Sequence, residues 1–168
     1  MTKLRGFNNM YTCGWNQALV APDLEENYIS AVLTISSSKL PKINLDFYTE
    51  LGIQHYTGSI ADLKDAALEE AALRIARIIN HFVSNDQRIL IRSNEDSGIS
   101  FSMIFYLIWA YYHNNDGTRK EKIKKPDTSI TTRAINEIKA HRIETDLDIG
   151  LTQKLYAYEN RINGSANH

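Results

Sequence analysis

The chain has 168 residues and a net charge of −1, and hydrophobic residues make up 43% of it. This length suits one domain with a sizeable core, and the balanced charge excludes a global attraction to nucleic acid or to an anionic membrane. With a single cysteine, Cys13, the chain cannot form an internal disulfide or a thiolate metal site.

The first half of the chain alternates short strands with short helices. Three apolar or β-branched runs predict strands, the first of them an edge strand: Tyr11–Gly14, Ala31–Ile35 and Ile53–Thr57. Between them, Pro22 with the acids that follow is typical of a helix start at Ala21–Glu26, and Phe47–Leu51 predicts a helical turn that Gly52 ends.

The second half is mainly helical. Apolar residues spaced by three and four predict an amphipathic helix over Ala66–Val83, followed by a strand at Arg88–Arg92. A polar loop from Ser93 to Gly98 then precedes an almost wholly apolar helix at Ile99–Tyr112. Two more helices are expected at Thr131–Arg142 and Ile149–Arg161, so the alternation indicates an α/β domain with a buried central sheet.

We expect a single domain over residues 1–168, with its core at about 8–161 and a flexible tail at 162–168. Met1–Gly6 lacks the basic-then-apolar pattern of a signal peptide, and the apolar run Ile99–Tyr112 is too short to span a bilayer. These features favour an intracellular location, cytoplasmic or nuclear, or a component of a virus particle.

The segment Ile89–Ser100 carries the functional argument. A strand, a polar loop and a buried helix form an architecture whose backbone amides can face a phosphate. The segment resembles the signature of cysteine-dependent protein phosphatases, an apolar strand followed by His-Cys, five loop residues, Arg, and Ser or Thr. The order of elements from Tyr11 to Arg161 is similar to that of the dual-specificity (tyrosine/serine) phosphatases. The resemblance implies a three-layer α/β fold with a mostly parallel sheet of about four to five strands between helices.

Position by position, the resemblance assigns a different residue to most members of the signature. Ser93 takes the place of the nucleophilic cysteine, Arg92 of the preceding histidine and Ile99 of the phosphate-binding arginine. Asp96 stands where a loop glycine is usual, while Ser100 keeps the hydroxyl that follows the arginine. Asp62 falls in the loop that carries the general acid in the family.

These departures remove the chemistry of the family. A serine hydroxyl is not ionised at neutral pH as a cysteine thiolate is, and isoleucine has no donor for phosphate oxygens. Glu95 and Asp96 would repel a phosphate dianion. Because an engineered substrate trap keeps the arginine, the loss of both groups favours natural divergence.

The resemblance therefore implies a catalytically inactive, cofactor-free pseudophosphatase that acts as a protein-binding or structural module. Its partner would be a phosphoprotein, a kinase or a phosphatase, and a homo-oligomer stays open. The expected binding residues are the loop itself: Arg92, Ser93, Asn94, Glu95, Asp96, Ser97 and Gly98.

Several alternatives stay open at the level of sequence. The loop could be an ordinary strand-to-helix connection with Ser97 as the helix cap, and Asp62 could be a solvated acid. A weakly active or altered hydrolase could use Asp62, or Glu95 and Asp96 around a divalent cation. A basic insertion could instead dock an acidic protein or, less readily, nucleic acid; its members are Arg119, Lys120, Lys122, Lys124 and Lys125.

Overall fold

The computed structural model describes residues 2–3, 9–13, 18–35, 42–60, 64–93, 96–141 and 147–166. Its strands are β1 (Thr2–Lys3), β2 (Met10–Cys13), β3 (Ile29–Ile35), β4 (Gln54–Gly58) and β5 (Arg88–Ser93). Its helices are α1 (Ala21–Glu26), α2 (Lys42–Glu50), α3 (Asp65–Ser84), α4 (Asp96–Tyr112), α5 (Ile130–Ala140) and α6 (Ile149–Ala166). The α/β alternation expected from the sequence is confirmed.

The sheet has five strands in the order β1-β2-β5-β3-β4. The pairs β2–β5, β5–β3 and β3–β4 are parallel, and only β1 runs antiparallel to its neighbour β2. The strand predicted at Tyr11–Gly14 is present as β2, but the prediction that it lies at the edge of the sheet was wrong. Within the described residues, Thr2–Lys3 covers the outer side of β2, so β1 forms that edge.

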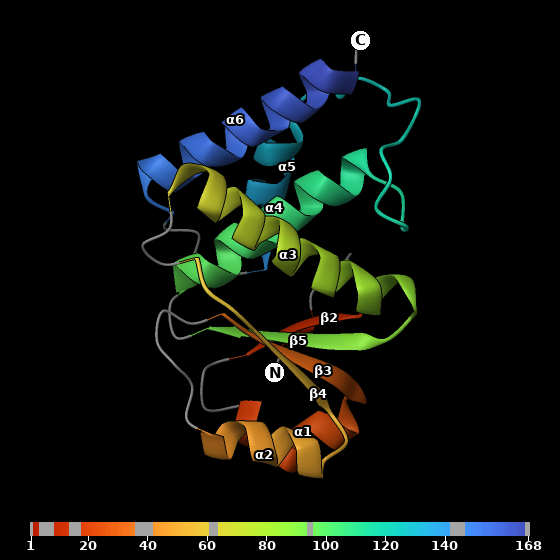
Figure 1. The fold of residues 1–168 in the computed structure, drawn as a ribbon, viewed down its shortest axis with the longest axis vertical. Helices are drawn as coiled ribbons and strands as arrows, with labels where there is room; N and C mark the ends of the chain where they lie inside the picture. The colour runs from red at the N-terminus through yellow and green to blue at the C-terminus, as the bar shows by residue number, and fades with distance from the viewer. Residues whose placement is uncertain are drawn as a thin grey trace.

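Helices cover both faces of the sheet, which makes the three layers visible in Figure 1. Helices α1 and α2 lie on one face, and α3, α4, α5 and α6 lie on the other. Because side chains alternate along a strand, each strand contributes to two cores. Leu90 and Val32 belong to the smaller core with α1 and α2, whereas Ile89 and Ile91 belong to the larger core.

Helix α3 matches its sequence pattern closely. Its apolar stripe, with Leu68, Ile75 and Ile79 at its centre, is buried against the sheet and α4. The predicted glycine stop after α2 is confirmed as well, since Gly52 has a φ of +69°, which an L side chain rarely adopts.

Several boundaries differ from the sequence prediction, and α2 already begins at Lys42, where only a turn from Phe47 was predicted. Helix α4 begins at Asp96 rather than at Ile99, so part of the expected polar loop is helical, and Ser97 lies inside the helix instead of capping it. Helix α6 continues to Ala166, and Ile162 is buried in the larger core. The predicted helix end at Arg161 is therefore wrong, because the apolar contact of Ile162 carries the helix further, whereas the flexibility expected for residues 162–168 stays a prediction.

The start of α5 is held by a buried carboxylate. Ser129 is the N-cap, and its hydroxyl accepts a hydrogen bond from the amide of Thr132. Glu159 of α6 accepts from the amides of Ile130 and Thr131, each at 2.8 Å. In the part of the chain that the structure describes, no helix is long and apolar enough to cross a membrane.

Candidate functional site

The candidate loop lies at the carboxyl end of the central strand. Strand β5 runs between β2 and β3, with Ser93 opposite Ile35 and Arg92 opposite both Cys13 and Thr34. Helix α4 begins at Asp96, so only residues 94–95 separate strand from helix. This is the strand-to-helix arrangement expected from the sequence, and its helix N-terminus favours an anion.

Ser93 ends β5 on the side of α4. Its side chain is buried, and a Cβ placed on Gly98 would lie 3.0 Å from the Ser93 hydroxyl and 3.2 Å from Ile35. The first turn of α4 therefore passes so close to the strand that a larger residue at position 98 would have to displace a neighbour. The Ser93 hydroxyl faces this first turn, and Ser93 is the residue that the resemblance assigns to the nucleophile position.

Ile99 and Ser100 are buried in the same turn. Ile99 belongs to the larger hydrophobic core with Ile35 and Phe101, and Ser100 is fully buried. An aliphatic side chain within this core offers no hydrogen-bond donor to an anion at the end of β5.

Arg92 points to the opposite face of the sheet, toward α2. Its side chain is 0% exposed, its Nε donates to the Thr34 hydroxyl at 2.8 Å, and its guanidinium lies 5.5 Å from the centre of the Tyr48 ring. Burial lowers the pKa of Arg92, whereas Tyr48 and Cys13 act in the opposite direction. Arg92 was expected among the binding residues, but a partner protein cannot reach a side chain buried in this layer.

His55 and Tyr48 complete the cluster around Arg92, and the sequence analysis assigned neither of them a role. His55 Nε2 and the Thr34 hydroxyl are hydrogen bonded at 2.8 Å, and the His55 ring stacks on Tyr48 with centroids 4.8 Å apart. Burial, followed by the charge of Arg92, lowers the pKa of His55 to about 4. Burial also raises the pKa of Tyr48 to about 12, and its hydroxyl donates to the carbonyl of Ala18. The cluster depends on the strand register, because the parallel pairing of β3 and β5 sets Thr34 beside Arg92. The sequence alone does not give this register.

Comparison with solved structures shows which fold this is. The Yvh1 phosphatase domain from Chaetomium thermophilum superposes with a TM-score of 0.70 at 18% identity, covering 95% of each chain. Human DUSP28 gives 0.68 at 12% identity, covering 94% of this chain and 96% of its own. The human tyrosine phosphatase-like serine/threonine/tyrosine-interacting protein gives 0.61 at 16% identity, covering 90% and 91%.

The chain has the dual-specificity phosphatase fold. Neither the protein-family models nor the curated protein sequences compared with the chain match it. The likeness is therefore one of fold, and the chemistry has to be argued from the residues themselves.

The single cysteine of this phosphatase-fold chain lies away from the candidate nucleophile position. Cys13 ends β2 opposite Arg92 and belongs with the smaller core. Burial raises the pKa of its thiol to about 11, although the chain's amino terminus and Arg92 act in the opposite direction. At neutral pH the Cys13 thiol is therefore protonated and is a poor nucleophile.

Several predicted site residues lie outside what the structure describes. Asp62, Asn94 and Glu95 are among them, and the side chains of Asp96 and Ser97 are as well. Their roles stay predictions. Within the described residues, no group of three or more His, Cys, Asp or Glu side chains could hold a metal ion.

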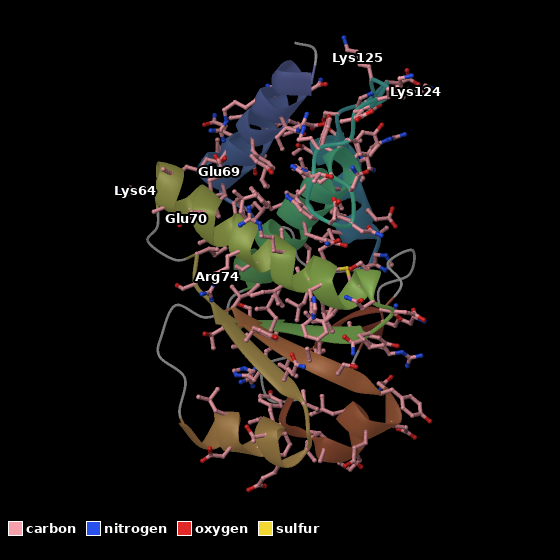
Figure 2. All side chains as sticks on the ribbon, turned by 45° about the vertical axis from the view of Figure 1, so that its right-hand side comes forward. Lys64, Glu69, Glu70, Arg74, Lys124 and Lys125 are labelled. Atoms are coloured by element: carbon pink, nitrogen blue, oxygen red, sulfur yellow. The ribbon has the colours of Figure 1, made fainter. Side chains whose placement is uncertain are left out.

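The basic segment after α4 divides into two parts. Arg119 donates to the carbonyl of Ile162 at 2.7 Å, and Lys120 donates to the carbonyl of Tyr111 at 3.0 Å. These two cations are half-buried; Lys120 binds the last turn of α4, and Arg119 ties the segment to α6. Lys122, Lys124 and Lys125 are exposed, and Figure 2 shows the last two on the loop at the end of the molecule.

Proposed function

We propose that this chain is a catalytically inactive phosphatase-fold domain that acts by binding a protein partner or as a structural component. The observation that carries the proposal is the pair Ser93 and Ile99 at the junction of β5 and α4. In the family that the sequence resembles, this junction supplies a thiolate and a guanidinium. Here the corresponding residues offer a hydroxyl and a buried aliphatic group.

The burial of Ile99 argues against the idea that this side chain has taken over phosphate binding from the family's arginine. A side chain that had taken over phosphate binding would have to present a donor at the mouth of the loop. Ile99 instead adds apolar surface to the core between the sheet and α4. This contact stabilises the fold and leaves the transition-state charge of phosphoryl transfer without its usual partner.

The state of Cys13 supports the same conclusion. A relocated cysteine could in principle serve as the nucleophile, but a thiol with a pKa of about 11 is ionised to only about 1 part in 10,000 at pH 7. It also packs with the smaller core, on the face of the sheet opposite to the core that holds Ile99 of α4. A cysteine mechanism is therefore disfavoured both at position 93, which holds a serine, and at Cys13.

The proposal is tested by hydrolysis of an aryl phosphate by the full chain between pH 5 and 8. The wild type is compared with Ser93→Ala, with and without Mg²⁺, Mn²⁺ and Zn²⁺. We expect equal background rates in all samples. A rate that Ser93→Ala abolishes would overturn the proposal, and so would metal-dependent turnover, which would favour the altered hydrolase using Asp62 or Glu95.

A thermal-shift series separates an empty loop from one that still binds an oxyanion. Phosphate, tungstate and a phosphotyrosine peptide are added to the wild type and to Ser93→Cys. The acidic residues Glu95 and Asp96 lead us to expect no shift in the wild type. A shift with the peptide alone would identify a phosphoprotein partner, and a shift with all three would show that the loop binds phosphate without catalysis.

We place the partner-binding face at the loop and propose recognition that does not depend on phosphate. The partner class stays as expected from the resemblance, namely a phosphoprotein, kinase or phosphatase, inside a cell or within a virus particle. One structural neighbour is named as a tyrosine phosphatase-like interacting protein, which supports this kind of role. A homo-oligomer is the structural alternative, and sedimentation of the purified chain distinguishes it.

The exposed part of the basic segment supports a second candidate function, docking of an acidic protein. Lys122, Lys124 and Lys125 are exposed cations on one loop, held at its base by Arg119 and Lys120. We expect any such binding to fall steeply with added salt. Replacing the three exposed lysines with glutamine should abolish it, and salt-insensitive binding would exclude this function.

A further inference from the structure

A hollow of about 570 Å³ lies beside the last turn of α4, and we call it the cationic hollow. It is bounded by α3, α4, α6 and the loop that follows α4. Its lining includes Arg77, Trp109, His113, Arg119, Lys120 and Arg161. Its volume falls within the usual range for small-molecule sites. Asp96 and Trp109 are about 20 Å apart along the axis of α4, so the hollow is separate from the Ser93 loop.

Positive charge dominates this hollow. Four cationic side chains line it against one carboxylate, Glu69, which is already paired with Arg161. The whole chain has a net charge of −1, so the excess of cations that line this hollow departs from the balance of the chain as a whole. Asp116 lies in an adjoining hollow, where its carboxylate accepts hydrogen bonds from Thr118. A concave surface of one sign attracts ligands of the opposite sign.

Arg119 and Lys120 are held in place by uncharged groups among the described residues. They donate to the backbone carbonyls of Ile162 and Tyr111, and the Arg119 guanidinium lies 5.6 Å from the centre of the Tyr112 ring. Carbonyls and rings orient a cation but do not cancel its full charge. Because these side chains are already ordered, an anion that binds them loses less free energy to side-chain ordering.

The same cationic side chains also act on the imidazole of His113. Its Nδ1 donates to the carbonyl of Trp109 at 2.7 Å, and its ring stacks on the Trp109 ring. Burial lowers the pKa of His113, and the charges of Arg119, Arg77 and Lys120 lower it further, against the opposing effect of the Trp109 carbonyl. A bound anion would offset these three cations and favour the imidazolium.

The walls provide apolar contact and an uncharged phenol group. Trp109 and Tyr158 are buried apart from the edges that line the hollow, and Leu73 and Ile162 add apolar surface. The Tyr158 hydroxyl has no hydrogen bond to the described part of the chain, and burial together with Glu69 raises its pKa, so it keeps its proton.

We propose that the cationic hollow binds a small organic molecule that carries two or more phosphate groups. The cations come from α3, from the loop after α4 and from α6, so a single phosphate would engage only part of them. The apolar wall at Trp109 and Leu73 favours an organic body over a bare inorganic ion. A nucleic-acid strand would require a cationic track that continues beyond the hollow, and it is treated as a distinct outcome of the test.

Isothermal titration of the full chain tests this inference with phosphate, pyrophosphate and ATP as probes. Arg77 is exposed and makes no side-chain hydrogen bond or ion pair with the described residues, so Arg77→Gln should leave the fold intact. We expect it to weaken ATP and pyrophosphate binding about tenfold. The matched control, Lys124→Gln with Lys125→Gln, removes exposed charge outside the hollow and should change the affinity less than twofold.

Proton uptake gives a second readout. Titration at pH 6 in two buffers of different ionisation enthalpy measures the net proton exchange on binding. Because the phosphate groups release protons when they meet cations, uptake at His113 is read as the difference between the wild type and His113→Gln, with the wild type taking up more. Failure to bind pyrophosphate or ATP at millimolar concentration would overturn the inference, and so would equal weakening by both charge variants. An oligonucleotide that binds more tightly than ATP and is lost in the lysine control would overturn it in favour of nucleic-acid docking. Ser93→Ala should not affect these titrations, which keeps the result independent of the proposed function.

Discussion

Replacement of Glu159 by glutamine tests how the closing helices are held together. Glu159 is 4% exposed, and its two carboxylate oxygens accept four hydrogen bonds. One oxygen accepts from the amide and hydroxyl of Thr131, each at 2.8 Å, and the other accepts from the amide of Ile130 and the hydroxyl of Tyr112. The carboxylate thus joins α6 to the first turn of α5 and the last turn of α4.

The magnitude follows from the chemistry of the amide. Glutamine keeps one acceptor oxygen, so one pair of donors stays satisfied and the other pair meets an NH₂ group. Each hydrogen bond to a charged acceptor contributes roughly 1.5–3 kcal/mol, and a buried donor without a partner costs about as much. The negative charge at the N-terminus of α5 is lost as well. We expect Glu159→Gln to lower the free energy of unfolding by about 3–5 kcal/mol.

Thermal and urea denaturation measure this effect. For a domain of this size, about 4 kcal/mol corresponds to a fall in Tm of roughly 8–15 °C. Tyr112→Phe is the matched control, because it removes one of the four donors and keeps the ring, and it should cost only about 1–1.5 kcal/mol. A Glu159→Gln variant that melts within about 2 °C of the wild type would refute the reasoning. So would a Tyr112→Phe variant that loses as much stability as Glu159→Gln.

Two further predictions concern the candidate loop and the cluster around Arg92. Gly98→Ala places a methyl group 3.0 Å from the Ser93 hydroxyl and should cost about 1–3 kcal/mol in urea unfolding, whereas Gly164→Ala, with nothing within 4 Å, should be neutral or stabilising. Equal effects at the two glycines would contradict the close approach of β5 and α4. For His55, the folded pKa of about 4 lies below the ordinary 6.5, so its stabilisation is complete above pH 6.5 and is lost as the pH falls toward 4. Allowing for partial exposure, the wild type should lose about 1–2 kcal/mol more than His55→Gln between pH 7 and pH 4.5, and parallel losses would refute this.

The fold was largely predictable because its signals are local. The stripe of α3 repeats at helical spacing, Gly52 stops α2, and the β-branched run at β3 is bounded by polar residues. Each of these features depends on neighbours in the sequence. The strand-to-helix junction at Ser93 was predictable for the same reason.

What the sequence did not reveal depends on contacts between distant segments. Arg92 was expected at a binding surface, yet parallel pairing with Thr34 turns its side chain toward Tyr48 of α2. Ile162 extends α6 because it packs in a core built from other elements, and no local pattern records that contact. The cationic hollow combines Arg77 with Arg119 and Arg161, which are brought together only by the packing of three segments.

The positions of these contacts bear on the proposed inactivity, because they stabilise the helices at both ends of α4 without phosphate-binding residues. Glu159 and its four donors hold α4, α5 and α6 at the end of α4 that is remote from Ser93. At the near end, Ile99 adds core contact in place of a cation that would need an anion or water beside it. Arg92 is likewise supported by Thr34 and Tyr48 on the far face of the sheet. Both ends of α4 are therefore held by contacts within the described residues, namely core packing of Ile99 at one end and the Glu159 hydrogen bonds at the other.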